Sequence, residues 1–345
     1  METKKRIEWI DAMRGFTMLL VVYAHVQSFG LNLNVDETFT FNRIFYLFRM
    51  PLFFFISGFI LYKATAIWDW ANTWAFLKKK FVVQIIPTTF FILVFAACFH
   101  TKLGNIFFSD MKYGYWFTYT LLEFFIVYTV LQNVIHLLNL KKCEDFILIA
   151  VAIGMFVVRS DRFIGIFNHD FAQFVGVKHW LYYFYFTFGC LVKKYFGTFQ
   201  RLLDSKYFLP MVQLTFLAAC IYIVNGSHFD KILRIYIALT GIVVVVAFFR
   251  KYEASFTQER RLGRCLQYVG RRTLDVYLLH YFFLPRGLNI NEYEWGGVIA
   301  NNPILEFTVS IFLSILVIGV CLVVSNVLRT SPVLGHYLFG VKLPQ

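Results

Sequence analysis

The chain of 345 residues is 59% hydrophobic and 20% aromatic, carries charged side chains at only 15% of its positions and has a formal net charge of +13 at pH 7. Because a soluble globular domain is usually about 45–50% apolar and about 25% charged, this composition excludes a large soluble core and indicates a protein that crosses a membrane several times. The six cysteines are scattered singly and show neither metal-ligand nor disulfide spacing, so we expect no bound metal.

Ten apolar segments follow one another along the chain, and each is predicted to be a helix because lipid cannot satisfy the hydrogen bonds of an open backbone. They are 8–30, 44–63, 81–99, 114–138, 145–158, 179–193, 207–225, 232–249, 273–290 and 304–328. When the N-terminus is placed inside, most Lys and Arg residues of the connections fall on the inner side. The positive-inside rule identifies that side as cytoplasmic.

The sequence therefore predicts an all-α integral membrane protein with about ten transmembrane helices and both termini in the cytoplasm. We expect residues 1–345 to form a single transmembrane domain with no appended soluble domain. The charge distribution follows the topology, so the net charge gives no reason to expect nucleic acid as a partner.

The first segment carries an arginine and a histidine eleven residues apart, Arg14 and His25. A step of eleven residues is about three helical turns plus 20°, so both side chains fall on one stripe, about 16 Å apart along the axis. Ionisable groups inside a membrane-spanning helix are costly and usually face a protein interior or a water-filled cavity. The pair indicates a polar path through the membrane. The alternative for Arg14 is a local ion pair with Asp11, one turn earlier.

The second segment carries Arg49 near its predicted outer end and Ser57 about 12 Å deeper. Gly58 follows, and the absence of a side chain there would admit either another helix or a thin ligand such as an acyl chain. Arg49 has an alternative interpretation, in which its side chain extends to the membrane interface without a chemical role.

The fourth segment begins near Trp116 and carries Glu123 about 10 Å deeper. This depth is similar to that of His25, so the Glu123 carboxylate could orient an imidazole and raise its basicity. The alternative is an ion pair with Arg49 or Arg234 that only holds helices together.

The ninth segment carries Asp275 and His280, and Arg271 and Arg272 precede it at the predicted cytoplasmic end. Arginines at such an entrance suit phosphate recognition through paired hydrogen bonds. The alternative is ordinary positive-inside anchoring.

Four motifs in chain order resemble the acyltransferase 3 family of bacterial membrane acyltransferases. The motifs are Asp11-Ala-Met-Arg14-Gly with His25, Arg49-x-Pro-Leu-Phe-Phe-Phe-Ile-Ser57-Gly58-Phe59, Trp116-Phe117 with Leu121-Leu122-Glu123, and Tyr277-Leu-Leu-His280. The resemblance implies a ten-helix fold, acyl-coenzyme A as the cytoplasmic donor and an acceptor on the far side of the membrane. One position departs from the pattern, since Phe48 precedes a single Arg49 where many members carry adjacent arginines.

Together these lines predict an acyltransferase of the bacterial cytoplasmic (inner) membrane. It would move an acyl group, most simply acetyl, from acyl-coenzyme A to a hydroxyl of an extracytoplasmic or lipid-linked glycan. The expected partners are acyl-coenzyme A, the glycan and membrane lipid, with no tightly bound cofactor. The catalytic residues would be His25 as general base, Glu123 and Arg49, and the donor-binding residues Arg14, Ser57, Gly58, Trp116 and His280. The alternative is a secondary transporter or glycan exporter that uses the same buried charges as an ion-coupling pathway.

Overall fold

A computed structural model describes residues 7–33, 41–159, 165, 168–225, 229–286, 288, 298–299 and 302–341. These residues form helices and connections and contain no strand, which confirms the all-α prediction. The chain divides into two compact units: Met1–Phe53 with Phe196–Ser325, and Phe54–Tyr195 with Asn326–Gln345. We call them unit 1 and unit 2.

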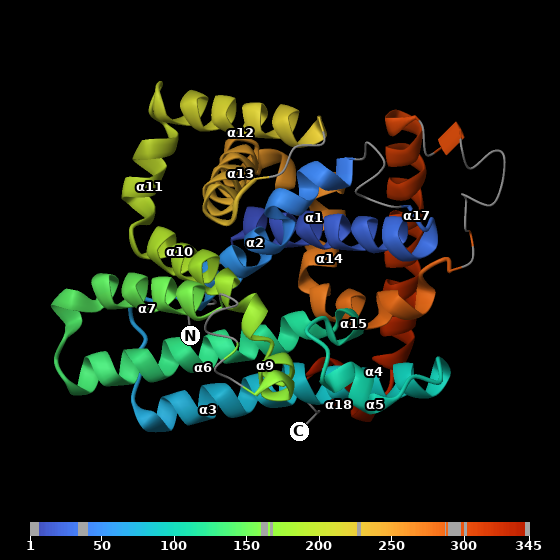
Figure 1. The fold of residues 1–345 in the computed structure, drawn as a ribbon, viewed down its shortest axis with the longest axis horizontal. Coiled ribbons are helices and arrows are strands. Elements are labelled where there is room, and N and C mark those ends of the chain that lie inside the picture. Colours follow the sequence, from blue (N-terminus) through green and yellow to red (C-terminus); the bar gives the residue numbers. More distant parts are fainter. Residues whose placement is uncertain are drawn as a thin grey trace. The chain divides into compact units, whose positions relative to one another are not determined.

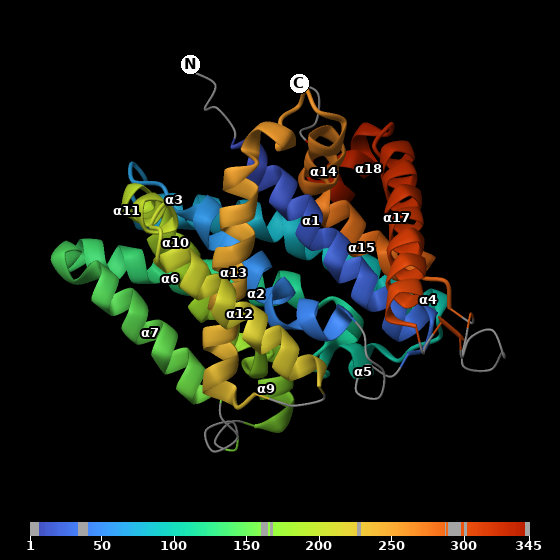
Figure 2. The ribbon, with the colours of Figure 1, turned by 90° about the horizontal axis from the view of Figure 1, so that it is seen from above.

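Unit 1 contains the predicted catalytic histidine and is built around the first helix. Its helices are α1 (Glu8–His25), the first part of α2 (Phe41–Leu61), α11 (Phe196–Leu203), α12 (Phe208–Val224), α13 (Lys231–Lys251), α14 (Arg261–Arg271), α15 (Thr273–Phe283) and most of α17 (Pro303–Leu328). Leu47, Ala219 and Ile237 form an apolar cluster that joins α2, α12 and α13. Figures 1 and 2 show α14 lying against α1, in agreement with the contacts between them.

Two glycines allow α1 and α14 to approach each other closely. A Cβ atom added to Gly15 would lie 2.0 Å from the carbonyl oxygen of Leu266, and one added to Gly270 would lie 1.9 Å from that of Asp11. Such distances are far below van der Waals contact, so only glycine fits at either position. The crossing places the N-terminal half of α1 directly against the basic helix α14.

Unit 2 contains the predicted site residues Ser57, Gly58, Trp116 and Glu123. Its helices are the second part of α2, α3 (Trp70–Lys80), α4 (Ile86–Cys98), α5 (Leu103–Phe107), α6 (Trp116–Leu137), α7 (Glu144–Val158), α9 (His169–Val175), α10 (Tyr183–Lys194) and α18 (Pro332–Phe339). A π-helical turn, η2 (Phe81–Ile85), joins α3 to α4. Within this unit α3 contacts α6, α7 contacts α10 and α18 contacts α4.

A second glycine crossing holds α2 against α10. A Cβ atom at Gly58 would lie 2.0 Å from the carbonyl oxygen of Phe186, and one at Gly189 would lie 2.0 Å from that of Phe55. Of the two neighbours that the sequence allowed for Gly58, a helix or a thin ligand, the structure shows the helix.

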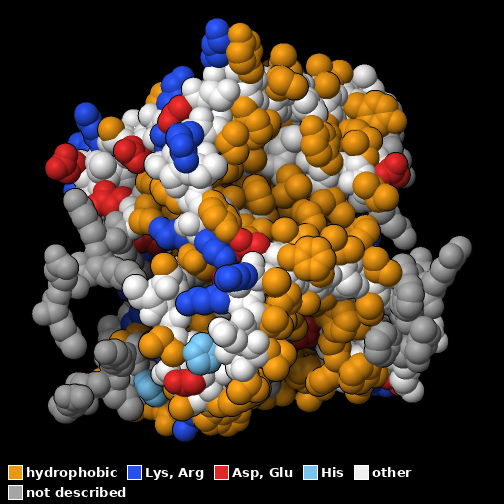
Figure 3. Space-filling view, turned by 90° about the vertical axis from the view of Figure 1, so that its left-hand side faces the viewer, with side chains coloured by type: hydrophobic (Ala, Val, Ile, Leu, Met, Phe, Trp, Pro, Cys, Tyr) orange, Lys and Arg blue, Asp and Glu red, His pale blue; other side chains and the backbone are white. Residues whose placement is uncertain are grey.

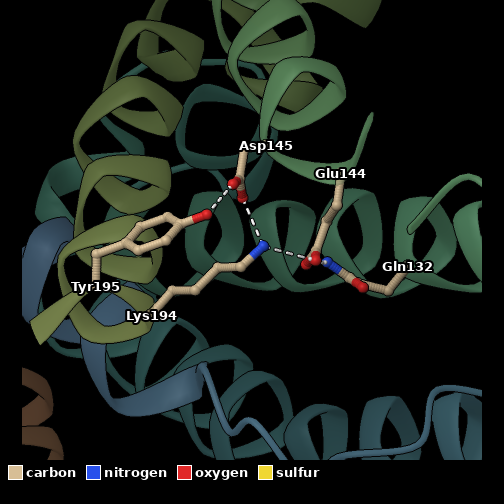
Figure 4. A network of polar contacts seen from close by, with 5 residues as sticks. All are labelled: Gln132, Glu144, Asp145, Lys194 and Tyr195. Carbon is tan, nitrogen blue, oxygen red and sulfur yellow. Dashed lines mark hydrogen bonds and ion pairs between the residues drawn. The ribbon is translucent and has the colours of Figure 1, made fainter. Parts of the chain in front are cut away.

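A network of charged side chains ties α6, α7 and α10 together in unit 2 (Figure 4). The ammonium group of Lys194 lies 2.8 Å from Glu144 Oε2 and 2.7 Å from Asp145 Oδ1. Gln132 donates to Glu144 over 2.8 Å, and the Tyr195 hydroxyl donates to Asp145. Each carboxylate therefore accepts two hydrogen bonds.

Five described helices are long and apolar enough to cross a membrane. They are Phe41–Leu61, Trp70–Cys98, Trp116–Leu137, Ile232–Lys251 and Pro303–Leu328, and a sixth span would result if α11 and α12, bent by 75°, are taken as one. Exposed apolar side chains such as Phe312 on α17 and Phe146 on α7 agree with lipid-facing surfaces, and hydrophobic side chains cover much of the face drawn in Figure 3.

Ten spans and the cytoplasmic placement of the termini stay predictions. The first, fifth, sixth and ninth segments do form helices, but α7, α10 and α15 have only 15, 12 and 11 residues. The ninth segment ends early because Leu284, extended with ψ 134°, precedes Pro285, and a residue before proline disfavours the helical conformation. In the first segment, the charges on Glu8, Asp11 and Arg14 lower the hydropathy.

Candidate active site

His25 is the last residue of α1, at the point where the helix changes its winding. A π-helical turn, η1 (Val26–Gly30), follows it directly, and such turns occur frequently at functional sites. The His25 imidazole is partly buried, and its Nε2 lies 3.0 Å from the hydroxyl of Tyr281 on α15. Phe29 stacks against it, with ring centroids 5.7 Å apart.

His280 lies beside this pair and is fully buried. Its ring centroid is 5.2 Å from that of His25 and 4.0 Å from that of Tyr281. His280 Nδ1 lies 3.0 Å from the Val276 carbonyl oxygen, and because a carbonyl can only accept, Nδ1 must carry the proton. In the neutral ring Nε2 then bears a lone pair, and within the described residues this atom has no hydrogen-bond partner. The structure therefore brings His25 and His280 together, and the lone pair on His280 Nε2 accepts no hydrogen bond from the described residues.

Arg49 contributes positive charge to the same unit. Its guanidinium donates to Asn42 and lies 5.3 Å from the centroid of the Tyr46 ring, over which Arg234 also lies at 4.4 Å. The charge of Arg49 interacts electrostatically with both His25 and Tyr281.

Arg14 lies on α1 one residue before the glycine crossing. Its Nη1 is 3.8 Å from Asp11 Oδ1, so the local ion pair considered from the sequence is present, at the outer limit of such contacts. The helix runs without interruption from Glu8 to His25, which keeps the predicted separation of three turns between Arg14 and His25. Asp275, by contrast, is buried and bonded to Ser325 and Arg272, which ties α15 to α17.

The other predicted site residues lie in unit 2. Glu123 accepts a hydrogen bond of 3.0 Å from Trp180 Nε1, and Trp116 stacks on His179 with ring centroids 4.0 Å apart. Ser57 is half-buried on α2 beside Gly58. In the described structure the hydrogen bond to the His25 imidazole comes from Tyr281, and the action of Glu123 on His25 stays a prediction.

Several buried polar residues near the C-terminal end of α1 were not identified from the sequence. Glu306 accepts from the Tyr23 hydroxyl over 3.3 Å and from Ser310 over 3.2 Å, and Gln27 donates to Tyr23 over 2.7 Å. Glu306 Oε2 and Gln27 Oε1 are buried without a partner in the described part of the chain. An acidic residue inside the tenth apolar segment was a usable signal for Glu306. Tyr281 offered none beyond its position after His280.

The family comparison covers all of these residues. A model of an acyltransferase domain, that of the acyltransferase 3 family, matches residues 7–323. The matched span includes both glycine crossings, His25 with its neighbours His280 and Tyr281, and the predicted residues of unit 2. No curated protein and no solved structure matches the chain.

Proposed function

Because the chain belongs to the acyltransferase 3 family and is therefore an acyltransferase of the membrane, we propose that it moves an acyl group from acyl-coenzyme A to a hydroxyl of a glycan. The donor, most simply acetyl-coenzyme A, binds from the cytoplasm, and the acceptor is extracytoplasmic or lipid-linked. The single observation that supports this best is the imidazole of His25, which lies 3.0 Å from a hydroxyl group in the structure itself. A general base must lie about 2.6–3.2 Å from the hydroxyl whose proton it removes.

In this reaction His25 takes the proton from the attacking hydroxyl while its oxygen forms a bond to the thioester carbonyl carbon. The tetrahedral intermediate then expels the coenzyme A thiolate, and the imidazolium returns the proton to that sulfur. General base catalysis of this kind typically contributes about 10²–10⁴-fold. The acyl group leaves as an ester of the acceptor, and no external proton is needed.

Arg49 is the proposed partner of the oxyanion. A preorganised positive donor in a site that excludes water stabilises developing charge by several kcal/mol, and the charge of Arg49 already acts on His25. Arg14 is proposed to receive the phosphates of the donor near the other end of α1, about 16 Å away along the helix. His280, Trp116 and Ser57 remain proposed donor contacts, and Glu123 a proposed catalytic carboxylate.

The test uses inverted membrane vesicles with wild type, His25→Ala or His136→Ala. His136 is exposed at the end of α6 and serves as the matched control. The vesicles receive acetyl-coenzyme A labelled on the acetyl group, and both coenzyme A release and label in extracted glycan or lipid-linked sugar are followed. We expect turnover in wild type and His136→Ala and a loss of at least about 10²-fold in His25→Ala.

Undiminished acyl transfer by His25→Ala would show that His25 is not the general base. An absence of turnover in wild type with acetyl-, succinyl- and longer acyl-coenzyme A, in the presence of the native acceptor pool, would contradict the proposed donor.

A further inference from the structure

The residue nearest to the proposed base is itself a potential nucleophile. A nucleophile and a base within hydrogen-bond reach, with the base held by further groups, are the structural signature of covalent catalysis, and tyrosine is one of the side chains that act in this way. The Tyr281 hydroxyl and His25 Nε2, 3.0 Å apart, meet that description. Resting on the proposed function, and replacing its single direct attack by two successive transfers, we propose that the acyl group passes through an O-acyl ester of Tyr281 before it reaches the acceptor.

The position of the Tyr281 hydroxyl is fixed by its surroundings. The side chain is only 2% exposed, and its ring packs against the imidazoles of His25 and His280, with centroid distances of 5.0 Å and 4.0 Å. Arg286 donates to the Tyr281 carbonyl oxygen over 3.1 Å. If the ring rotated away from His25, the buried hydroxyl would lose its hydrogen bond to the His25 imidazole, which is costly. The phenol is therefore held against the base.

The charges around Tyr281 suit an attack by its oxygen. Both Arg49 and Arg286 interact electrostatically with the phenol, so two positive groups are placed to stabilise the charge that develops on the oxygen and on the tetrahedral intermediate. A free phenolate would be costly at a buried position. Proton removal by His25 must therefore accompany the attack.

The first half-reaction joins donor and enzyme. His25 Nε2 takes the phenolic proton as Tyr281 Oη forms a bond to the thioester carbonyl carbon. The bond from that carbon to sulfur breaks, and the imidazolium gives the proton to the coenzyme A sulfur. The products are the acyl-tyrosine enzyme and free coenzyme A.

The second half-reaction repeats these roles with the acceptor. His25 takes the proton from the acceptor hydroxyl, whose oxygen attacks the carbonyl carbon of the acyl-tyrosine. The bond from that carbon to Tyr281 Oη breaks, and the proton returns to Oη. The enzyme is regenerated with one acylated acceptor formed, and no other reactant is required.

The order of leaving groups supports this sequence of steps. Thiols and phenols are of comparable acidity, with ordinary pKa values of about 8.5 for cysteine and about 10 for tyrosine. Exchange of an acyl group between a thiol and a phenol is therefore close to balanced. Sugar hydroxyls are much weaker acids, which makes the second transfer downhill. A covalent intermediate also lets donor and acceptor occupy the site in turn, which suits substrates that approach from opposite sides of a membrane.

The experiment looks for the ester directly. Purified full-length protein is mixed with labelled acetyl-coenzyme A without acceptor and quenched in acid, and its peptides are analysed by mass spectrometry. Wild type is compared with Tyr281→Phe and with Tyr236→Phe, which removes the hydroxyl of an exposed tyrosine on α13 in the same unit. We expect one acetyl group on Tyr281 and a burst of about one coenzyme A per enzyme in wild type and Tyr236→Phe.

Tyr281→Phe should show neither label nor burst and should lose at least about 10³-fold in turnover, as expected when a covalent nucleophile is removed. The melting temperature of Tyr281→Phe is measured alongside to confirm that this variant folds. If it does not fold, the label on the wild-type protein still tests the inference. Label on His25 instead of Tyr281, or near-normal turnover of Tyr281→Phe, would overturn the inference. So would wild-type coenzyme A release that occurs only with acceptor present and leaves no label on Tyr281, although the proposed function would then stand. Failure of the proposed function itself would appear as no coenzyme A release with any acceptor.

Discussion

Both units bring helices together at glycine crossings, and both hold buried polar atoms without a described partner, such as Gln84 Oε1 in unit 2. The charged network around Lys194 in unit 2 and the residues around His25 in unit 1 nevertheless differ in how their buried polar groups are paired. In the Lys194 network of unit 2, the carboxylates of Glu144 and Asp145 each accept two hydrogen bonds. Around His25 in the described part of unit 1, by contrast, three buried polar atoms have no partner: His280 Nε2, Gln27 Oε1 and Glu306 Oε2.

This difference separates a structural cluster from a chemical one. A buried polar atom without a partner costs about 1–3 kcal/mol, and proteins tolerate such conflicts mainly at functional sites. These three atoms lie on α15, on η1, the turn that directly follows His25, and on α17. The paired charges around Lys194 are therefore expected to support stability, and the unpaired atoms around His25 to support function.

The largest expected effect concerns what the units share, the glycine crossings. Alanine normally stabilises a helix by about 1 kcal/mol relative to glycine, and we expect the opposite for Gly270→Ala in unit 1 and Gly189→Ala in unit 2. Their Cβ atoms would lie 1.9 Å and 2.0 Å from backbone oxygens, so the helices must separate at a cost of about 3 kcal/mol or more. The melting temperature in detergent measures the effect.

Each unit offers a matched control. Within the described residues, no atom from outside the helix's own backbone lies within 4 Å of a Cβ atom added to Gly319 on α17 or to Gly154 on α7. Alanine at these two positions should leave the melting temperature unchanged or raise it. A tolerated alanine at Gly270 but not at Gly189, or the reverse, would show that the two crossings are not equivalent.

A smaller effect is expected from Lys194→Met, which leaves Glu144 and Asp145 without their shared cation. Because these side chains are partly exposed, we expect a loss of about 1–3 kcal/mol, below the cost of breaking a fully buried pair. Turnover per folded molecule should stay within about twofold of wild type. Adding Glu144→Gln should restore part of the stability, because it removes one unpaired charge.

The pH dependence of this contribution has a definite sign. Burial opposes the charge on Lys194, but its hydrogen bonds to Asp145 and Glu144 raise the pKa of Lys194 above the ordinary value. A raised pKa in the folded state means that the contribution is fully present below the ordinary lysine value of about 10.4 and is lost as the pH rises through the raised value. The difference in melting temperature between wild type and Lys194→Met should therefore be constant from pH 6 to about 9. A difference that disappears within that range would contradict the assignment.

The smallest effect on stability is expected from His280→Leu in unit 1. The substitution removes the unpaired Nε2 atom, so the folded state should be unchanged or more stable by up to about 1 kcal/mol. Turnover should nevertheless fall about tenfold or more, equivalent to the loss of about 1.4 kcal/mol of interaction with the reacting groups. Melting temperature and acyl transfer are measured on one preparation. A destabilised variant with full turnover would show that His280 supports the stability of unit 1 and not the reaction.

Local chemistry made the general architecture predictable. Hydropathy depends on composition over about 20 residues, and it indicated the helices, the five described spans and the multi-pass membrane protein. The motifs around Arg14, His25 and Arg49 identified the family, which the match over residues 7–323 confirms. Gly58 was recognised as a point of close approach because that property belongs to the residue itself.

The partners of these residues were decided only by the tertiary structure. Helical spacing shows which face of α1 carries His25, but it does not show which residue of another helix meets that face. The Tyr281 hydroxyl on His25, the Glu306 carboxyl beside Tyr23 and the backbone of α14 against Gly15 all join positions more than 200 residues apart. Such contacts arise from the packing of whole helices, and no local pattern of residues encodes that packing.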